Sequence, residues 1–433
     1  MSALVVWRDT RRVGRLDTAP NGDVRFAYDA AVVANPHPAD RVGFRCPVRA
    51  APYAGPDAAA VFENLLPEGG LRDALGQATK HDPGDTVGLL GVVGGECAGA
   101  LQLWPEHVVP PTAAVYDPVT QATLTTAFAT AGGQLRQVMG RASLSGAQPK
   151  LVLWRRPPAG SPAGSPTAPP GHTAGRTPEY RLPRNGAPTT VVVKRPSPQF
   201  PGFLEAELVG MRLMEAAGVP TASSAPCLLA PNCHESARFD RTMDADGTVH
   251  RLHAEDGCQL TGRVSRQKYA GAGGVTFHDV VAVLRRAAAQ PAAGREQLLR
   301  WAVANAVMGN YDAHAKNLSV LYDAQGTVRL APAYDVVVTT LFAGLDQTFA
   351  LAFGGTTHPA ALTPQRLRSV AREFDVALPQ VTALTVDVLA RVHGALPSVL
   401  HAVLGLGGDA AVMERLSVAV TATANAFAAR LEL

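Results

Sequence analysis

Residues 309–319 of the chain read Gly-Asn-Tyr-Asp-Ala-His-Ala-Lys-Asn-Leu-Ser, and residues 331–336 read Ala-Pro-Ala-Tyr-Asp-Val. Asp312 and Asn317 are separated by four residues in the first stretch, and Asp335 lies near the end of the second. One carboxylate can orient a hydroxyl group and accept its proton, while a second carboxylate and an amide oxygen can hold Mg²⁺ against phosphate oxygens. This set of side chains predicts chemistry on a phosphorylated ligand.

The spacing of these groups is typical of a protein kinase. Four residues separate Asp312 from Asn317 as in a kinase catalytic loop, and Asp335 follows a predicted strand pair, as the second kinase aspartate does. Asp312 is then the catalytic base, Asn317 and Asp335 are metal ligands, and Lys316 neutralises the transferring phosphoryl group. The alternative is a helix cap with solvated polar neighbours, because this spacing alone is a weak pattern.

Lysine usage supports the same chemistry. Only five of the 39 basic residues are lysines: Lys80, Lys150, Lys194, Lys268 and Lys316. A lysine ammonium is a compact charge suited to phosphate, and Lys194 ends an apolar strand predicted over 191–194. The helix predicted over 203–217 carries Glu205 and Glu207. We prefer Glu207 as the partner of the lysine, since Glu205 lies near the helix start. An edge lysine that extends into solvent is the alternative.

Residues 141–150, Arg-Ala-Ser-Leu-Ser-Gly-Ala-Gln-Pro-Lys, form a loop of small residues before a predicted strand. Such a loop can bring backbone N–H groups and Lys150 close to phosphates. It matches neither the Walker A pattern nor the glycine-rich loop of kinases, so its spacing alone indicates only a turn that contains serine.

The composition excludes several classes of protein. With 47% hydrophobic and 17% charged residues over 433 positions, the chain is globular and long enough for two or three domains. The net charge of +3 is not concentrated in a basic block, so no large nucleic-acid surface is expected. The five cysteines include no Cys-x-x-Cys pair, which favours a reduced, cytoplasmic protein. No export signal is expected, because the first residues lack a basic stretch followed by a long apolar core. No membrane contact is expected, because Arg, His and Pro interrupt the most apolar later stretch, 388–406.

The pattern along the chain changes from strands to helices, which predicts an α+β fold with two lobes. Residues 3–50 alternate as in a small antiparallel sheet, and two short helices are expected within 58–75. Residues 157–188 are rich in Pro, Gly, Ser and Thr and are predicted to be a flexible insertion at the tip of a hairpin. A strand pair is expected over 320–322 and 328–331, within a mostly helical second half.

Several motifs, in the same order along the chain, resemble the HipA family of serine/threonine-protein kinase toxins. They cover about residues 3–340, and the helical remainder fits the C-lobe of the family. The motifs are VVWRDTRRVGRL (5–16), FENLLPEG (62–69), SLSGAQPK (143–150), VVVKRP (191–196), ARFDR (237–241), HAEDGCQ (253–259), GNYDAHAKNLS (309–319) and APAYDV (331–336).

This resemblance implies a kinase-like fold that binds ATP between its lobes and, with Mg²⁺, phosphorylates a protein serine. The best-known member acts on an aminoacyl-tRNA synthetase. His314 and Lys316 would complete the active-site loop of Asp312. Ser143 would be autophosphorylated, with Ser145 as a second candidate, and the added charge should disrupt the phosphate contacts of its loop. The residues implied in nucleotide binding are Lys194, Lys150, Glu207, Ser145, Gly146, Ala147, Gln148 and, at the adenine hinge, Arg238 and Phe239.

The resemblance also implies the domain order and the partners. An N-terminal subdomain would cover residues 1–110, a kinase N-lobe 111–240 and a helical C-lobe 241–433. A helix-turn-helix antitoxin related to HipB would restrain the toxin, and DNA would be contacted only through that antitoxin.

Three positions depart from the family motifs. Ala237 replaces an acidic residue, Ala254 replaces a glutamine, and Pro149 removes a backbone donor from the serine loop. Two other functions fit the same residues, namely a small-molecule phosphotransferase and an ATP-binding pseudokinase that acts as a co-repressor with its antitoxin. The presence of Asp312, Asn317 and Asp335 favours an active kinase.

Overall fold

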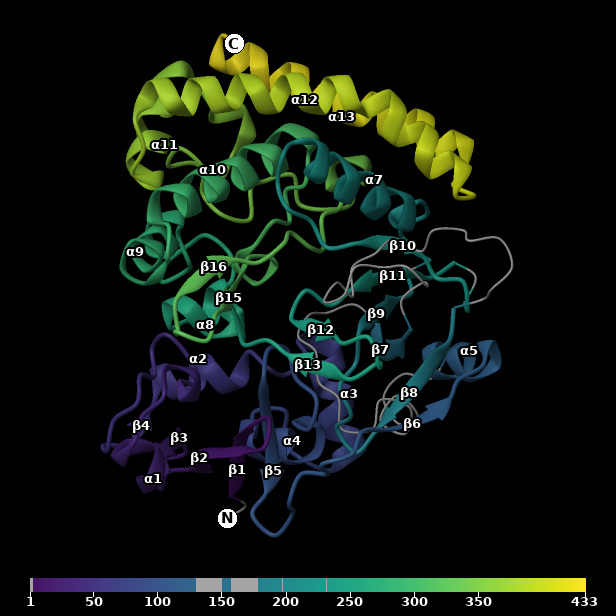
Figure 1. Cartoon of the computed structure of the whole chain (residues 1–433). Helices are drawn as coiled ribbons and strands as arrows, with labels where there is room; N and C mark the ends of the chain where they lie inside the picture. The colour runs from purple at the N-terminus through teal and green to yellow at the C-terminus, as the bar shows by residue number, and fades with distance from the viewer. Residues whose placement is uncertain (1–2, 130–149, 157–177, 197, 231) are drawn as a thin grey trace. The chain divides into compact units, whose positions relative to one another are not determined.

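The computed structural model of the chain describes residues 3–129, 150–156, 178–196, 198–230 and 232–433. It divides into two compact units, each made of several segments. Unit 1 comprises Met1–Arg195, Ser223–Ser265 and Leu321–Gly326, and unit 2 comprises Pro196–Ala222, Arg266–Val320 and Thr327–Leu433. Sheets predominate in the N-terminal part and helices in the C-terminal part (Figure 1), so the α+β class that the sequence predicts is confirmed.

A five-stranded antiparallel sheet in unit 1 has the order β4-β3-β2-β1-β5. Apolar residues such as Val13, Leu16 and Phe26 are buried in its core. The sheet expected within residues 3–50 is therefore confirmed. Its strands are β1 Leu4–Arg8, β2 Arg11–Thr18, β3 Val24–Tyr28, β4 Tyr53–Ala54 and β5 Leu101–Pro105.

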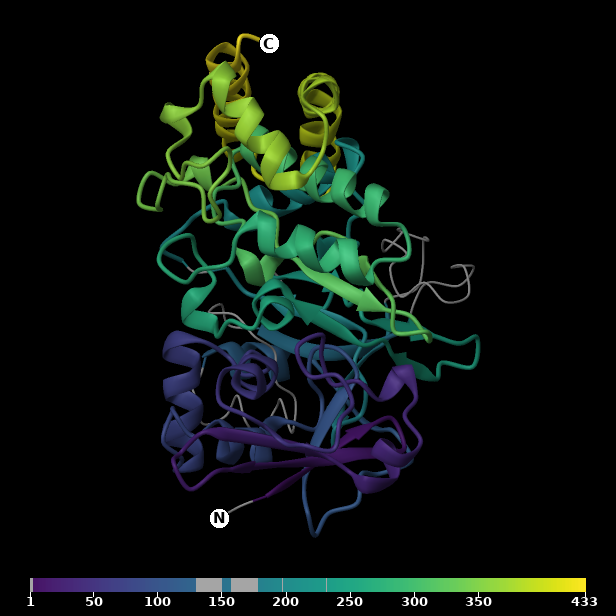
Figure 2. The same cartoon turned by 90° about the vertical axis from the view of Figure 1, so that its left-hand side faces the viewer.

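Helices α2 and α4 cover one face of this sheet (Figure 2) and share its apolar core. The two short helices predicted within 58–75 are confirmed as α2 and α3, with a break between them around Pro67. The helices of this region are α1 Ala30–Ala34, α2 Pro56–Glu63, α3 Gly69–Thr79 and α4 Thr86–Val93.

A six-stranded sheet, ordered β10-β11-β9-β7-β8-β6, forms the other layer of unit 1. Its strands are β6 Val115–Pro118, β7 Lys150–Arg155, β8 Tyr180–Arg184, β9 Val191–Lys194, β10 Ser224–Pro226 and β11 His234–Ala237, and α5 Gln121–Ala129 packs against it. Strands β7 and β9 pair antiparallel, as the predicted hairpin requires.

One prediction in this region was wrong. The range 157–188 was expected to be wholly flexible, but its last part contains β8, which pairs with β7 and β6. Tyr180 and Leu182 alternate into the core, and this short signal was hidden among prolines and glycines. Residues 157–177 lie outside the described part of the chain.

Short elements complete unit 1. Strands β12 and β13 pair as an antiparallel hairpin, and α8 begins with a capping box in which Asp256 and Gln259 bond to each other's backbone N–H groups. The elements are β12 Arg241–Met243, β13 Val249–Arg251, β14 Ala254–Asp256 and α8 Gly257–Thr261.

Unit 2 is built around α10, which packs against α7, α9, α12 and α13. The helix expected over 203–217 and the strand pair after the catalytic-loop stretch are confirmed as α7 and as β15 with β16. The elements are α7 Phe203–Ala216, α9 Phe277–Ala287, α10 Pro291–Met308, β16 Val328–Leu330, α11 Leu367–Phe374, α12 Leu378–Gly405 and α13 Ala410–Leu431. Strand β15, Ser319–Tyr322, begins in unit 2, and its last two residues belong to the Leu321–Gly326 segment of unit 1.

Helix α12 is long and apolar enough to cross a membrane by length and composition alone. It lies side by side with α13 (Figures 1 and 2) and also packs against α7 and α10. The face turned to these helices is buried at Val381, Val388, Val392, Leu396 and Val403. Burial on one face against neighbours is typical of a helix in the core of a helical bundle, so the composition of α12 is weak evidence for a membrane.

Candidate active site

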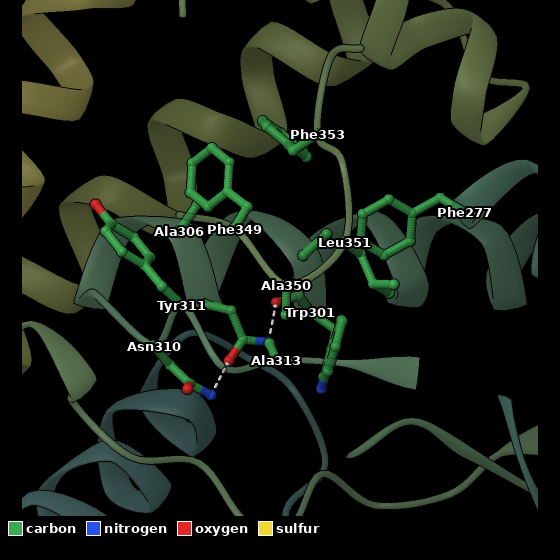
Figure 3. A pocket seen from close by; sticks show the side chains of 12 residues that line it. Phe277, Trp301, Ala306, Asn310, Tyr311, Ala313, Phe349, Ala350, Leu351 and Phe353 are labelled. Atoms are coloured by element: carbon green, nitrogen blue, oxygen red, sulfur yellow. Dashed lines mark hydrogen bonds between the residues drawn. The ribbon is translucent and has the colours of Figure 1, made fainter. Parts of the chain in front are cut away.

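The catalytic-loop stretch begins at the C-terminal end of α10, where buried amides hold it. The side chain of Asn310 donates a hydrogen bond to Asn305 Oδ1 at 2.7 Å, and Asn305 donates to the carbonyl of Trp301 at 2.9 Å (Figure 3). Both asparagines are 3% exposed. Because buried amides that find partners fix the backbone around them, the loop starts from a rigid point.

Tyr311, the residue before Asp312, is held through its main chain. Its N–H donates to Thr339 Oγ1 at 2.9 Å, and its carbonyl accepts from the N–H of Ala350 at 2.8 Å. Its ring meets Phe349 edge-on at 5.1 Å within the apolar pocket shown in Figure 3. The segment around Phe349 therefore supports the loop from behind.

Asp312 is the single exposed residue of the range 301–322, in which every other residue is buried. Its backbone carbonyl accepts hydrogen bonds from the N–H of His314 at 2.8 Å and from the side-chain amide of Asn317 at 3.1 Å. The main chain of Asp312 is thus fixed while its carboxylate remains accessible, which is what a general base requires.

The residues that follow Asp312 are buried and lie together. His314, Lys316 and Asn317 are 8%, 4% and 7% exposed, and the last two belong to a 3₁₀ turn, Ala315–Asn317. The hydroxyl of Tyr334 donates to the carbonyl of Lys316 at 2.6 Å. This bond ties the catalytic loop to the residue directly before Asp335.

Asp335 has a left-handed backbone, with φ of +57°. This conformation costs a non-glycine residue about 1–2 kcal/mol, although aspartate tolerates it better than most. Neighbouring hydrogen bonds maintain it, since Ala333 donates to Pro220 O at 2.7 Å and accepts from Ala222 N at 2.8 Å. Strained residues held in this way cluster at functional sites.

Helix α7 approaches the backbone that follows Asp335 through a glycine. A β-carbon on Gly210 would lie 2.4 Å from the carbonyl oxygen of Val336, so only glycine permits this contact. Glu207, one turn earlier, is fully buried. Glu205, in the first turn of α7, accepts from the N–H of Asp409, the N-cap residue of α13, at 3.5 Å, and its role at the start of α7 stays a prediction.

Unit 1 brings three nitrogen-bearing side chains into one row across its six-stranded sheet. Lys194 lies directly opposite Lys150 on β7 and opposite His234 on β11. Directly opposite residues project from the same face of a sheet. A row of this kind fits a bound polyanion. The predicted pair of Lys194 with Glu207 involves residues of different units and stays a prediction.

The segment predicted as the adenine hinge is locked by buried ion pairs within unit 1. The guanidinium of Arg238 donates to Glu96 at 3.0 Å and to Asp240 at 2.7 Å. Glu96 also pairs with Arg241 and Arg251, both at 2.9 Å. Burial alone would raise the pKa of Glu96, but the three guanidinium groups outweigh it and lower this pKa to about 2.

These contacts change what Arg238 can offer to a nucleotide. Its guanidinium also donates to Thr189 Oγ1 at 3.0 Å and to the Cys97 carbonyl at 2.8 Å, so the side chain is occupied by the protein itself. Phe239, between two buried charged residues, is half-buried. The Arg238 guanidinium is therefore not among the groups that this segment offers to a ligand.

Most of the serine loop lies outside the described part of the chain. Its predicted phosphorylation sites, Ser143 and Ser145, and its predicted nucleotide contacts Gly146, Ala147 and Gln148 lie outside the described residues. Lys150, the last residue of the loop, is described as the first residue of β7.

One residue at the loop was missed by the sequence reasoning. The hydroxyl of Tyr269 donates a hydrogen bond to Asp312 Oδ1 at 3.1 Å, and its ring meets the His314 ring edge-on at 5.3 Å. The one available signal was Lys268, a rare lysine that no motif had explained.

Two family profiles cover most of the chain. The HipA N-terminal domain matches residues 4–104, and the HipA-like C-terminal domain matches residues 142–396. The chain belongs to the HipA family of kinases. A protein of Sinorhizobium fredii that is named as a candidate kinase, Y4mE, is 34% identical over 98% of this HipA-family chain and 97% of its own.

Two further comparisons concern Shewanella oneidensis. Its serine/threonine-protein kinase toxin HipA is 24% identical over 70% of this chain and 68% of its own length. The solved complex of the Shewanella HipA with HipB and operator DNA matches with a TM-score of 0.80 at 20% identity, covering 99% of this chain and 98% of that chain. At this identity the match confirms the fold of this HipA-family kinase and no more.

The oxygen donors of the loop fit magnesium. Asn317 uses its amide nitrogen to hold the loop, so its amide oxygen is the atom that it can offer to a cation. Asp335 is half-buried and adds a carboxylate. Among the described residues, no group of three or more His, Cys, Asp and Glu side chains is arranged to hold a metal. Two protein oxygens completed by substrate phosphates are what Mg²⁺ commonly uses in kinases.

Proposed function

We propose that this HipA-family kinase transfers the γ-phosphoryl group of ATP to a protein serine and acts as the toxin of a toxin–antitoxin pair. The observation that carries the transfer is the isolated exposure of Asp312 on an otherwise buried loop, next to the amide of Asn317. A rigid loop that leaves one carboxylate accessible supports a base that meets an incoming hydroxyl group.

In the proposed reaction, Asp312 orients the serine hydroxyl and accepts its proton. The serine oxygen forms a bond to the γ-phosphorus, the bond from that phosphorus to its bridging oxygen breaks, and ADP leaves. Lys316, buried in the same loop, offsets negative charge during the transfer. Mg²⁺ held by Asn317 and Asp335 would neutralise phosphate charge.

The nucleotide would be held by unit 1. Lys150 and Lys194 lie directly opposite each other on β7 and β9, and two compact positive groups on one face of the sheet favour binding of its phosphates. The backbone around Phe239 would contact adenine, because the neighbouring Arg238 and Asp240 are fixed by the ion pairs with Glu96 and with each other.

The toxin role is supported by the relatives. Shewanella HipA is named a kinase toxin, and its solved complex holds HipB and operator DNA. By analogy, a HipB-like helix-turn-helix antitoxin would restrain this kinase in the cytoplasm and provide the contact with DNA. A cellular protein such as an aminoacyl-tRNA synthetase would be the target, and phosphorylation of Ser143, or of Ser145, would disrupt the phosphate contacts of the serine loop.

Labelled ATP with Mg²⁺ followed by phosphopeptide mass spectrometry tests the transfer. We expect the wild-type chain to carry phosphate on Ser143, and Asp312→Asn and Asp335→Asn to carry none. Asp246→Asn, in the exposed turn between β12 and β13, is the matched control and should behave as the wild type.

Three results would contradict the proposal. Equal labelling of all variants would mean that Asp312 and Asp335 are not the reactive groups. Bound ATP without transfer to the chain, to proteins or to water would indicate a pseudokinase. Transfer to hydroxyl-bearing metabolites alone would indicate a small-molecule phosphotransferase.

A further inference from the structure

Tyr269 contacts the catalytic-loop candidate through its side chain, although it lies more than 40 residues earlier in the chain. Its hydroxyl donates to Asp312 Oδ1 at 3.1 Å. Its ring packs edge-on against His314, with an interplanar angle of 79°, and the ammonium of Lys268 lies 5.2 Å from the ring centre. The tyrosine nevertheless remains 45% exposed.

The backbone on both sides of Tyr269 is bonded to the segments that hold the loop. The carbonyl of Lys268 accepts from the N–H of Ala315 at 3.1 Å, and the N–H of Ala270 donates to the carbonyl of Ala350 at 2.7 Å. Ala350 in turn donates to the carbonyl of Tyr311. The phenol is therefore placed from both sides by the same framework that places Asp312.

We infer that Tyr269 is a positioning residue for phosphoryl transfer: its hydroxyl fixes one oxygen of Asp312 so that the other meets the substrate hydroxyl. The carboxylate torsion of an aspartate is broad, and a single donated hydrogen bond suffices to select one orientation. Reaction rates fall steeply when a reacting group is misplaced by about 1 Å. This inference rests on the proposed function, in which Asp312 is the base.

A purely structural role fits the contacts less well. The side chain is 45% exposed, so its ring packing is partial and contributes less to stability than that of a fully buried tyrosine. The hydroxyl makes a directed bond to an exposed carboxylate, whereas ring packing on His314 would need no hydroxyl. The two roles are separable, because Tyr269→Phe keeps the ring and removes only the donor.

The test uses the full chain with γ-labelled ATP and Mg²⁺. Label on the protein and phosphate released to water are both counted. Two quantities are measured for the wild type and each variant: the transfer rate at saturating ATP and the ATP concentration that gives half of this rate. We expect Tyr269→Phe to lower the saturated rate about 10-fold and to leave the half-saturating ATP concentration within about 2-fold. Its melting temperature should stay within about 1 °C of that of the wild type. Tyr116→Phe, which removes a half-buried hydroxyl bonded to Pro188 O at 2.7 Å, is the control and should transfer phosphate at the wild-type rate.

Each other outcome has one meaning. A Tyr269→Phe rate equal to that of the wild type overturns the inference, and if Tyr269→Leu alone is slow, the ring acts by packing. A faster Tyr269→Phe also overturns it, because the hydroxyl would then block the base. A wild type without any transfer, or an Asp312→Asn variant as fast as the wild type, would instead refute the proposed function.

Discussion

The two charged regions of this kinase are built in opposite ways. In unit 1, Glu96 is fully buried and its oxygens are bonded to arginine side chains. In unit 2, Asp312 is exposed, and its backbone rather than its carboxylate anchors the loop. In the first region the charged groups bind one another, while in the second a carboxylate stays accessible to a ligand.

The difference shows how a functional charge can be separated from a structural one. A buried carboxylate needs several partners to offset desolvation, and those partners also remove it from chemistry. The base candidate avoids this conflict because buried neighbours, Asn305 and Asn310, fix its backbone from outside the site. Stability and reactivity should therefore respond to different substitutions.

The largest effect is expected at the exposed carboxylate. Asp312→Asn keeps the shape of the side chain and removes the proton acceptor, so phosphoryl transfer should fall about 100- to 10,000-fold. The melting temperature should stay within about 1 °C, because the backbone bonds of Asp312 are retained. Calorimetry beside the labelled-ATP assay checks both. A variant that loses stability together with activity would show that this carboxylate also holds the fold.

The opposite pattern is expected at the buried carboxylate. Glu96→Gln leaves the guanidinium groups of Arg241 and Arg251 with a neutral partner, which should lower the free energy of unfolding by about 3–5 kcal/mol. Urea unfolding measures this loss. The matched control is Glu106→Gln, whose exposed pair with Arg15 should contribute less than about 1 kcal/mol.

Lowering the pH should remove the stabilisation that the buried carboxylate of Glu96 provides. The pKa of Glu96 is depressed in the fold, so its stabilisation is present above about pH 4.5 and is lost as the pH falls towards 2. The stability gap between the wild type and Glu96→Gln should close over that window. A gap that stays constant would mean that the ionised form of Glu96 contributes nothing to stability.

The sequence predicted the groups that lie close together along the chain and missed the contacts between residues that are far apart in sequence. Asp312 and Asn317 lie in one short segment whose spacing is informative by itself. Glu96 and Arg238 lie 142 residues apart, and no sequence pattern connects them. The resemblance to the family assigned Arg238 to nucleotide binding, whereas its guanidinium bonds to Glu96 and Asp240. The contact of Tyr269 with Asp312 was missed for the same reason, since only the fold brings the two residues together.

Glu255 is a buried carboxyl whose hydrogen-bond donors are the N–H of Phe44 and the hydroxyl of Tyr322. Burial raises the pKa of Glu255 from 4.5 to about 7, although hydrogen bonds from Tyr322 and from the N–H of Phe44 oppose the shift. A raised carboxyl pKa stabilises the fold below the unfolded pKa, and this contribution is lost as the pH rises through the folded one. We expect a loss of about 3 kcal/mol between pH 4.5 and 7.

Comparison with Glu255→Gln isolates this effect from other titrations. The pKa of the neighbouring His253 is lowered by burial, so that group changes stability in the opposite direction over part of the range. Urea unfolding of the wild type and Glu255→Gln at steps from pH 4.5 to 7.5 removes the contribution that both share. The free energy of unfolding of the wild type should fall relative to that of Glu255→Gln as the pH rises. Parallel curves for the two proteins would refute a raised pKa of Glu255.

The smallest effect is expected at Gly210, where stability and activity should change together. A β-carbon there would lie 2.4 Å from the carbonyl of Val336, so Gly210→Ala must move α7 or the backbone next to Asp335. Overpacking of this kind costs about 1–3 kcal/mol, and a shifted Asp335 should reduce phosphoryl transfer several-fold. Gly394→Ala, in α12 with open space around it, is the matched control and should be neutral or slightly stabilising. If Gly210→Ala were destabilised but fully active at low temperature, the close approach of α7 would support the fold without positioning Asp335, the proposed metal ligand.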